Sequence, residues 1–155
     1  WGNPEGVRRF AADLEKAGAR LAAAGVTLSY HNHSHEFQKF EGKTELEMIL
    51  EATRPEHLKI EVDTYWVQHG GGDVAEWIRR LSGRLDLLHM KDMGMVLREQ
   101  KYAEPGEGNL NWPAILKAAR EANVKWYIVE LDVCPRDSFE SLAISYRNCR
   151  GMGIG

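Results

Sequence analysis

The sequence predicts an α/β protein with a parallel sheet, because four short β-favouring runs alternate with longer runs of helical periodicity. Helices of this length between strands act as right-handed crossovers, which make successive strands parallel. Four such units fit either half of a (β/α)8 barrel or an open doubly wound sheet. With 155 residues, of which 43% are apolar, the chain can bury one core, so we expect a single domain over residues 1–155.

The strands are predicted where β-branched and aromatic residues cluster, at residues 26–30, 58–63, 85–89 and 126–130. None of them is followed by GxGxxG, GxxxxGKS or GxxxxGKT, so the nucleotide-binding forms of an open sheet lose support. The glycine triplet at residues 70–72 is no such motif, and we expect it to let the chain turn before the next helix.

The first helix is predicted over residues 4–24, where apolar side chains recur at spacings of three and four and Gly25 provides a stop. Gly18 weakens this prediction, since a glycine inside a helix costs about 1 kcal/mol relative to alanine. Thr44, Asp73 and Asn111 stand at positions typical of helix caps. The later helices are predicted over residues 44–52, 73–81, 111–122 and 138–148.

Composition and charge exclude several classes of protein. The net charge of −3 and the absence of a clustered basic face argue against a nucleic-acid partner. No apolar run approaches 18 residues, and the N-terminus has no signal-peptide pattern, so we expect no membrane association. Cys134 and Cys149 lack CxxC spacing and suit a reducing compartment. We therefore expect a cytoplasmic protein.

Every predicted strand runs into ionisable side chains at its carboxyl end. They are His31, His33, Glu36, Asp63, His89, Lys91, Asp92, Glu130 and Asp132. A single acid in such a place is usually a helix cap or a solvated loop residue, but four successive strands with such endings favour a functional site. In a (β/α)8 barrel, the active site forms where these strand ends converge. Carboxylates with an imidazole suit Mn²⁺ or Mg²⁺, with Zn²⁺ or Co²⁺ as alternatives.

Three further ionisable residues stand apart from this set. His57 lies in a polar loop beside Pro55, and we leave it out of the site. His69 follows Asp63 in the next loop, and its role stays open. Glu61 shares a strand face with Asp63, and we interpret it as part of a polar layer of the barrel.

Five segments carry a resemblance to a known family. They are YHNHSHEF at 30–37, DTYW at 63–66, HMKD at 89–92, PGEGNLNW at 105–112 and VELD at 129–132. In this order they resemble the sugar phosphate isomerase/epimerase (xylose isomerase-like) superfamily. The resemblance implies a (β/α)8 TIM barrel, of which this chain would supply four βα units as the C-terminal half.

The resemblance also implies a divalent metal, Mn²⁺ being the ion we expect first. Asp63, His89 and Glu130 match the family's metal ligands. We expect Glu36 as the fourth ligand, with His31 or His33 as the alternative.

Such an ion would assist removal of a proton α to the carbonyl of a sugar or keto-sugar. The candidate catalytic residues are His31, His33 and Glu130, and the two histidines share strand parity, as a base and shuttle should. Lys91 is expected to neutralise a substrate oxyanion. Trp66 is expected to form an apolar wall against a sugar ring, with ordinary packing as the alternative.

Three functions follow from these expectations. The first is a metal-dependent sugar isomerase or epimerase. The alternatives are a metal-dependent dehydratase or lyase of a keto-sugar or inositol-type substrate, and an inactive half-barrel fragment. Half a barrel leaves two strand edges open, so we expect either a homo-oligomer or a missing N-terminal half.

Overall fold

The computed structural model describes residues 2–134 and 136–155, and a parallel sheet of four strands forms its centre. The strands are β1 (Ser29–His31), β4 (Lys59–Asp63), β5 (Leu85–Met90) and β8 (Trp126–Val129), and they lie side by side in chain order. A doubly wound sheet would reverse its strand order, whereas a barrel keeps it. The predicted α/β class is confirmed, and the sheet is consistent with half of a barrel.

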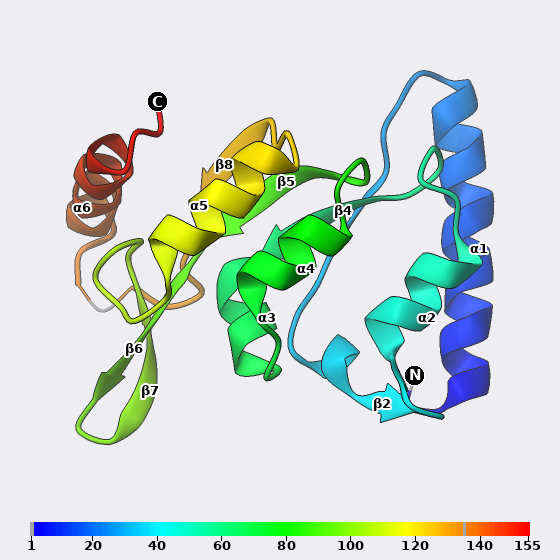
Figure 1. Ribbon diagram of the computed structural model, residues 1–155, viewed down its shortest axis with the longest axis horizontal. Helices are drawn as coiled ribbons and strands as arrows, with labels where there is room; N and C mark the ends of the chain where they lie inside the picture. Colours follow the sequence, from blue (N-terminus) through cyan, green and yellow to red (C-terminus); the bar gives the residue numbers. More distant parts are fainter. Residues whose placement is uncertain (1, 135) are drawn as a thin grey trace.

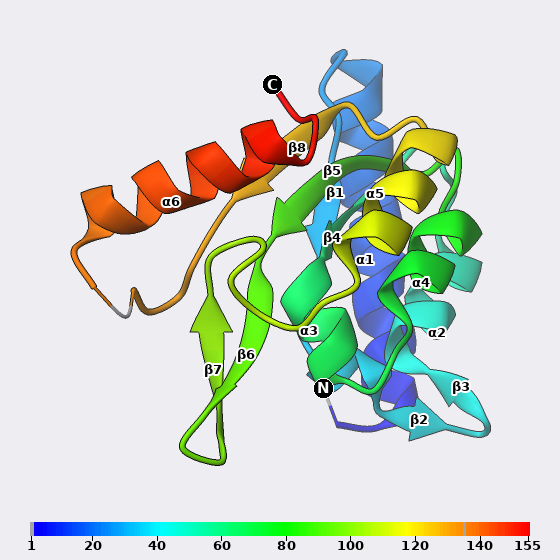
Figure 2. The same cartoon turned by 60° about the vertical axis from the view of Figure 1, so that its left-hand side comes forward.

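Helices cover one face of this sheet, as Figure 1 and Figure 2 show. They are α1 (Pro4–Ala23), α2 (Glu45–Ala52), α4 (Val74–Arg80) and α5 (Trp112–Glu121). A last helix, α6 (Ser138–Gly151), follows β8. The predicted helices are therefore all present, with ends that differ from the expected ones by a few residues at most. Among the described residues, no helix is long and apolar enough to cross a membrane.

Side-chain caps fix where these helices begin. Thr44 and Glu47 form a complete capping box before α2, in which the Thr44 hydroxyl accepts from Glu47 N at 3.1 Å and the Glu47 carboxylate accepts from Thr44 N at 2.7 Å. Asp73 accepts from Glu76 N at 2.8 Å before α4, and Asn111 caps α5 in the same way. The capping signals in the sequence thus locate the helix starts correctly.

Gly18, the weak point in the prediction of α1, is required by packing. A Cβ atom at this position would lie 2.0 Å from the carbonyl oxygen of His57. The helix can therefore approach the loop before β4 closely only with glycine there.

The core lies between the sheet and the helices. In β4, Ile60 and Val62 face this core and are fully buried, whereas Glu61 faces the other side of the sheet, as strand alternation requires. The remaining core comes from the strands and helices that flank β4. Its main members are Leu46, Trp77, Ile78, Leu85, Leu88, Met90, Ile115 and Leu116.

Two elements at the carboxyl edge of the sheet escape the sequence prediction. The predicted loop after Asp63 contains a short helix, α3 (Thr64–His69), and the chain after Asp92 forms a hairpin of β6 (Asp92–Val96) and β7 (Glu99–Ala103). The hairpin turn places Leu97 and Arg98 at φ 50° and 68°, although such turns usually contain glycine or asparagine. The sequence therefore carries no turn signal there.

The structure also differs from the sequence prediction around the first strand. β1 begins at Ser29 rather than at residue 26, because Val26 N donates to Leu21 O at the end of α1 and not to a neighbouring strand. After β1, the chain forms a 3-10 turn, η1 (His35–Phe37), and a small hairpin of β2 (Lys39–Phe40) and β3 (Lys43–Thr44).

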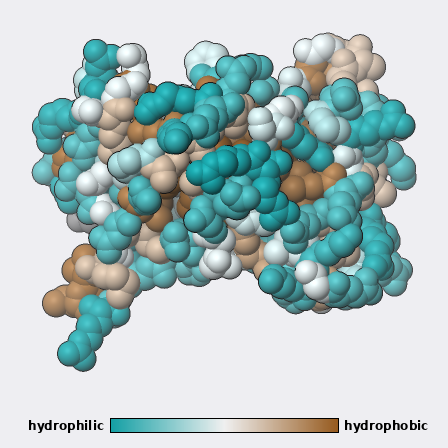
Figure 3. Space-filling model, in the orientation of Figure 1, coloured by the Kyte–Doolittle hydropathy of each residue, from teal (hydrophilic) through white to brown (hydrophobic). Residues whose placement is uncertain are grey.

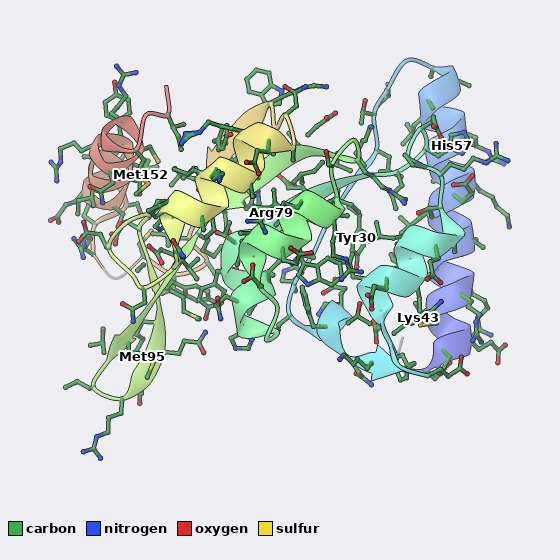
Figure 4. All side chains as sticks on the ribbon, viewed as in Figure 1. Tyr30, Lys43, His57, Arg79, Met95 and Met152 are labelled. Carbon is green, nitrogen blue, oxygen red and sulfur yellow. The ribbon has the colours of Figure 1, made fainter. Side chains whose placement is uncertain are left out.

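The β6–β7 hairpin projects away from the body of the molecule. Figure 3 shows hydrophobic surface near its end, and Figure 4 shows Met95 on this projection. Met95, Val96 and Leu97 are all exposed, with Leu97 at 92%. This apolar end is unusual for a surface hairpin, which normally ends in polar residues.

The face of the sheet opposite the helices is open. On β8, Tyr127 and Val129 pack against the core, while Trp126 and Ile128 point the other way and are 66% and 37% exposed. In a closed barrel this face would line the interior. The edges of β1 and β8 are also without a neighbouring strand among the described residues.

We expect β1 and β8 to pair with additional strands, supplied by a second copy or by further βα units. Unpaired backbone groups and exposed apolar side chains at sheet edges favour such pairing. Sedimentation velocity at micromolar concentration should show a dimer or larger species, and Ile128→Lys should weaken it. A monodisperse monomer whose β1 amides exchange slowly with deuterium would contradict this prediction.

Candidate functional site

The carboxyl ends of the four strands gather the predicted site residues at one edge of the sheet. β1 supplies His31, β4 supplies Asp63, β5 supplies His89 and leads into Lys91, and Glu130 follows β8. In the sheet register, Asp63 lies directly beside His89. The expected convergence of strand ends is therefore present for these five residues.

Asp63 lies at the centre of this group and is fully buried. Its Oδ1 accepts from Trp66 N at 3.0 Å and so caps α3. Its Oδ2 lies 3.3 Å from His31 Nε2 and 3.0 Å from Lys91 Nζ. One carboxylate thus both starts a helix and faces the site.

Two buried polar side chains hold the main chain around Asp63 in place. Asn32 Oδ1 accepts from Asp63 N at 3.1 Å, which ties the end of β4 to the chain after β1. The Thr64 hydroxyl donates to Lys91 O at 2.7 Å and lies 3.1 Å from Lys91 N. These bonds link β4 to β5 beyond the point where the sheet ladder ends.

His31, Asp63 and His89 offer ligand atoms that lie within 4.8 Å of one another. Two ligands of one divalent ion are at most about twice the metal–ligand distance apart, roughly 4–5 Å. His89 Nδ1 is 3.7 Å from Asp63 Oδ2 and 3.9 Å from Glu130 Oε2, and it is buried without a hydrogen-bond partner. Since a buried polar atom normally has a partner, this nitrogen and its carboxylate neighbours fit a bound cation.

Lys91 is the cation that the protein itself places here, and only 1% of it is exposed. Its ammonium lies 3.0 Å from Asp63 Oδ2 and 2.6 Å from Asp132 Oδ2, and it also contacts Glu130 Oε2. A buried ammonium requires such pairing, because an unpaired charge in the interior is very costly. Sequence reasoning expected Lys91 in the site but did not foresee its burial.

The charges around this lysine shift the pKa values of the site. Burial disfavours the charged form of Asp63, yet the hydrogen bond with His31 and the proximity of His89 and Lys91 outweigh it, so the pKa of Asp63 lies well below its usual range. Burial likewise opposes charge on Lys91, but Asp132, Glu130 and Asp63 hold the pKa of Lys91 above its usual value. Both groups are therefore charged at neutral pH.

Glu36 does not join this group. It is buried beside Tyr30, whose hydroxyl donates to Glu36 Oε1 at 2.7 Å, and His33 N donates to Glu36 Oε2 at 2.9 Å. Its ligand atoms group with those of His33 and His35 instead. Tyr30 and His31 are neighbours in a strand and point to opposite faces, and η1 contacts α2, so the Glu36 carboxylate lies on the helix side. The expected convergence of Glu36 with Asp63 is not observed.

Aromatic rings form a wall beside His31 and Lys91. The ring of His33 is 4.8 Å from that of His31 and 5.4 Å from that of Trp66. Trp66 also lies 5.5 Å from Lys91 Nζ, and its Nε1 is buried without a partner. Trp66 therefore lies beside His33 and Lys91. Burial, and then the charge of His31, lowers the pKa of His33.

The hairpin adds residues that sequence reasoning missed. Tyr102 lies 4.5 Å from the ring of Tyr65 and 5.7 Å from Lys91 Nζ. Gln100 Nε2 donates to the Tyr65 hydroxyl at 2.9 Å. No signal in the sequence could have found them, because the hairpin itself was not predicted.

The other ionisable residues have structural partners. His57 Nδ1 lies 2.7 Å from Glu15 on α1, and Figure 4 shows His57 beside that helix. His69 stacks on Tyr65 at 5.8 Å within α3. Asp92 organises the next loop. It accepts from the main-chain nitrogens of Met93, Gly106, Gly108 and Leu110 and from Trp112 Nε1.

Comparison with known proteins gives one family match and several relatives. A model of the xylose isomerase-like TIM barrel matches residues 1–143. The inosose dehydratase of Mesomycoplasma hyopneumoniae (strain 7448) is 29% identical over 148 residues, covering 82% of this chain and 47% of that protein. The inosose dehydratase of Geobacillus kaustophilus (strain HTA426) is 27% identical over 79% of this chain and 44% of that protein. The chain thus spans about half the length of the curated relatives it matches.

One solved structure is similar in both sequence and fold. A sugar phosphate isomerase/epimerase from Parabacteroides distasonis ATCC 8503 has a TM-score of 0.80 at 29% identity, over 94% of this chain and 52% of that chain. Nearly the whole of this chain therefore has the same fold as the matching part of that structure.

The affinity of the site for a divalent ion should rise with pH through and above the ordinary histidine range. Burial acts against charge on His89, but Asp63, Glu61 and Glu130 together raise its pKa above 6.5, so a proton persists on the ring and competes with the ion. Isothermal titration with Mn²⁺ between about pH 6 and pH 9 brackets the ordinary value and tests this. An affinity that does not change over that range would contradict it. His57→Gln, outside the site, should leave the profile unchanged.

Proposed function

The chain belongs to the xylose isomerase-like TIM-barrel family, and on this basis we propose that it carries the metal site of a divalent-metal-dependent sugar isomerase or epimerase. The reaction proposed is removal of a proton α to the carbonyl of a sugar or keto-sugar, followed by its return. The observation that carries the proposal is the buried, unpartnered His89 Nδ1 facing Asp63 and Glu130.

We assign the metal ligands as His31, Asp63, His89 and Glu130. His31 replaces Glu36 in this set, because His31 shares the group of Asp63 and His89 whereas Glu36 is held on the helix side by Tyr30. Two imidazoles and two carboxylates suit Mn²⁺ first, with Mg²⁺, Zn²⁺ or Co²⁺ as alternatives. Such an ion, when bound, supplies Lewis acidity to the carbonyl oxygen and the neighbouring hydroxyl of the substrate.

His33 is the proposed base. Its ring faces both His31 and Trp66, and its lowered pKa keeps the imidazole neutral and able to accept a proton at neutral pH. Glu130, on the opposite edge strand of the sheet, is proposed to handle the proton on the other face of the substrate, besides its role as a ligand. His31, taken as a ligand, is then not available as the second base that the sequence suggested.

Lys91 and Trp66 are proposed to hold the substrate. The Lys91 ammonium, charged at neutral pH, is proposed to neutralise the negative charge that develops on the substrate oxygen when the proton leaves. Trp66 offers a ring face for the apolar side of a sugar, and its unpartnered Nε1 can donate to a substrate hydroxyl. The partner we propose is therefore a small polyhydroxy ketone or aldehyde.

Dehydration is the second candidate, and the relatives named inosose dehydratase favour it. Proton abstraction α to a ketone followed by loss of the β-hydroxyl begins with the same step. The residues assigned above serve that first step without change, and His33, protonated in that step, is proposed to give its proton to the departing hydroxyl.

The ligand assignment is tested with two matched variants. We expect His31→Gln to weaken Mn²⁺ binding by about 10-fold or more, whereas Glu36→Gln should leave it nearly unchanged, because only His31 lies in the group of Asp63. Titration calorimetry measures both constants. The opposite result would return Glu36 to the metal site and overturn the assignment.

The reaction class is tested by isotope exchange. The Mn²⁺-loaded chain, in its associated form, is incubated in D₂O with an inosose and separately with a ketopentose. Deuterium at the carbon α to the carbonyl with retained mass otherwise indicates epimerisation or isomerisation, and loss of one water indicates dehydration. His33→Gln should abolish the exchange while Mn²⁺ binding persists. Failure of the metal-loaded species to exchange either substrate would count against the proposed function.

A further inference from the structure

Glu61 is a partly buried carboxylate to which the proposed mechanism assigns no role. It lies two residues before Asp63 on the same face of β4, and its side chain is 17% exposed. Its Oε1 lies 3.0 Å from His89 Nε2. In the part of the chain that the structure describes, His89 is the only side chain within ion-pair distance of Glu61.

The two nitrogens of His89 face different surroundings. Nε2 lies against Glu61, one layer deeper in the sheet, whereas Nδ1 faces Asp63 Oδ2 at 3.7 Å and Glu130 Oε2 at 3.9 Å. A neutral imidazole carries a proton on one nitrogen and a lone pair on the other. Whichever group accepts the proton therefore decides where the lone pair points.

A shift in the sheet register produces this arrangement. Ile60 pairs with Leu85, but Glu61 pairs with Leu87 and Asp63 with His89, so Asp86 is an extra residue on β5. Without the shift, Asp63 would lie beside Leu88, which faces the core. The bulge thus places His89 on the face of the sheet that Glu61 and Asp63 already share.

We propose that Glu61 is a positioning residue, which holds His89 in the tautomer protonated on Nε2 and so directs the Nδ1 lone pair at the metal. Of the proposed function, this inference needs only the bound metal ion and not the reaction. Carboxylates that accept the second ring N–H of a ligating histidine fix its orientation and raise its basicity. A carboxylate that only filled a polar layer of the barrel would have no effect on the tautomer.

Two variants of Glu61 and one matched control separate these roles. Glu61→Ala removes the acceptor, while Glu61→Gln keeps a carbonyl oxygen that can still accept from Nε2. Asp86→Asn is the control, because it also removes one carboxylate near the sheet, but its partner is Lys125 at 3.2 Å. If Glu61→Ala does not fold, the parent chain and Glu61→Gln still report the tautomer.

The first readout is the tautomer of His89 in the metal-free chain. Ring ¹⁵N shifts are recorded at a pH where the imidazole is neutral. We expect protonation on Nε2 in the parent, in Glu61→Gln and in Asp86→Asn, and a loss of this preference in Glu61→Ala. Protonation on Nδ1 in the parent would overturn the proposal.

The second readout is the affinity for Co²⁺, measured by titration of the same four proteins. Loss of such a carboxylate typically weakens metal binding about 10–100-fold, and we expect that for Glu61→Ala. Glu61→Gln should lose less, and Asp86→Asn should match the parent. Equal affinity of Glu61→Ala and the parent would overturn the positioning role. If the parent binds no Co²⁺, the proposed function fails, while the tautomer still decides the role of Glu61.

Discussion

The buried charge of Asp63 is the constraint on which the rest of the site depends. A carboxylate without solvent contact needs donors for both oxygens, since an unpaired buried charge would cost several kcal/mol. Oδ1 takes the Trp66 N–H at the start of α3, and Oδ2 takes His31 and Lys91. The same residue therefore ends β4, begins α3 and orders the site. This explains why α3 follows the strand directly, with Trp66 held beside Lys91.

The open side of the sheet is the second constraint. Helices satisfy one face, but Trp126 and Ile128 on the other face have no cover among the described residues, and β1 and β8 have free edges. Parallel sheets are normally covered on both faces by other parts of the protein. The site residues sit at the rim of this uncovered face. Whatever completes the sheet therefore also closes the site on that face.

Local patterns in the sequence were enough to predict the strands, the capped helices and the convergence of Asp63, His89 and Glu130. Glu36 was expected beside Asp63 from the resemblance alone, but the chain leaves β1 and enters η1 before this residue, so its side chain does not continue the strand face of His31. The hairpin was missed because Leu97 and Arg98 adopt positive φ without a glycine or asparagine to signal it. The burial of Lys91 depends on carboxylates from the ends of two strands, Asp63 at the end of β4 and Glu130 and Asp132 after β8, and no local pattern contains this combination.

The charges of the site bear on how it can hold an ion. Glu61, Asp63, Glu130 and Asp132 bring four formal negative charges, and Lys91 returns one positive charge, which leaves −3 around His89. The raised pKa of His89 is a response to this excess, because a proton on the ring reduces it. A divalent ion reduces it further than a proton does, and it can do so without displacing Lys91 if it occupies the His31 and His89 side of Asp63. The lysine and the ion would then both contact the Asp63 carboxylate, and the ion would favour the neutral form of His89, because it competes with the proton for the ring nitrogen.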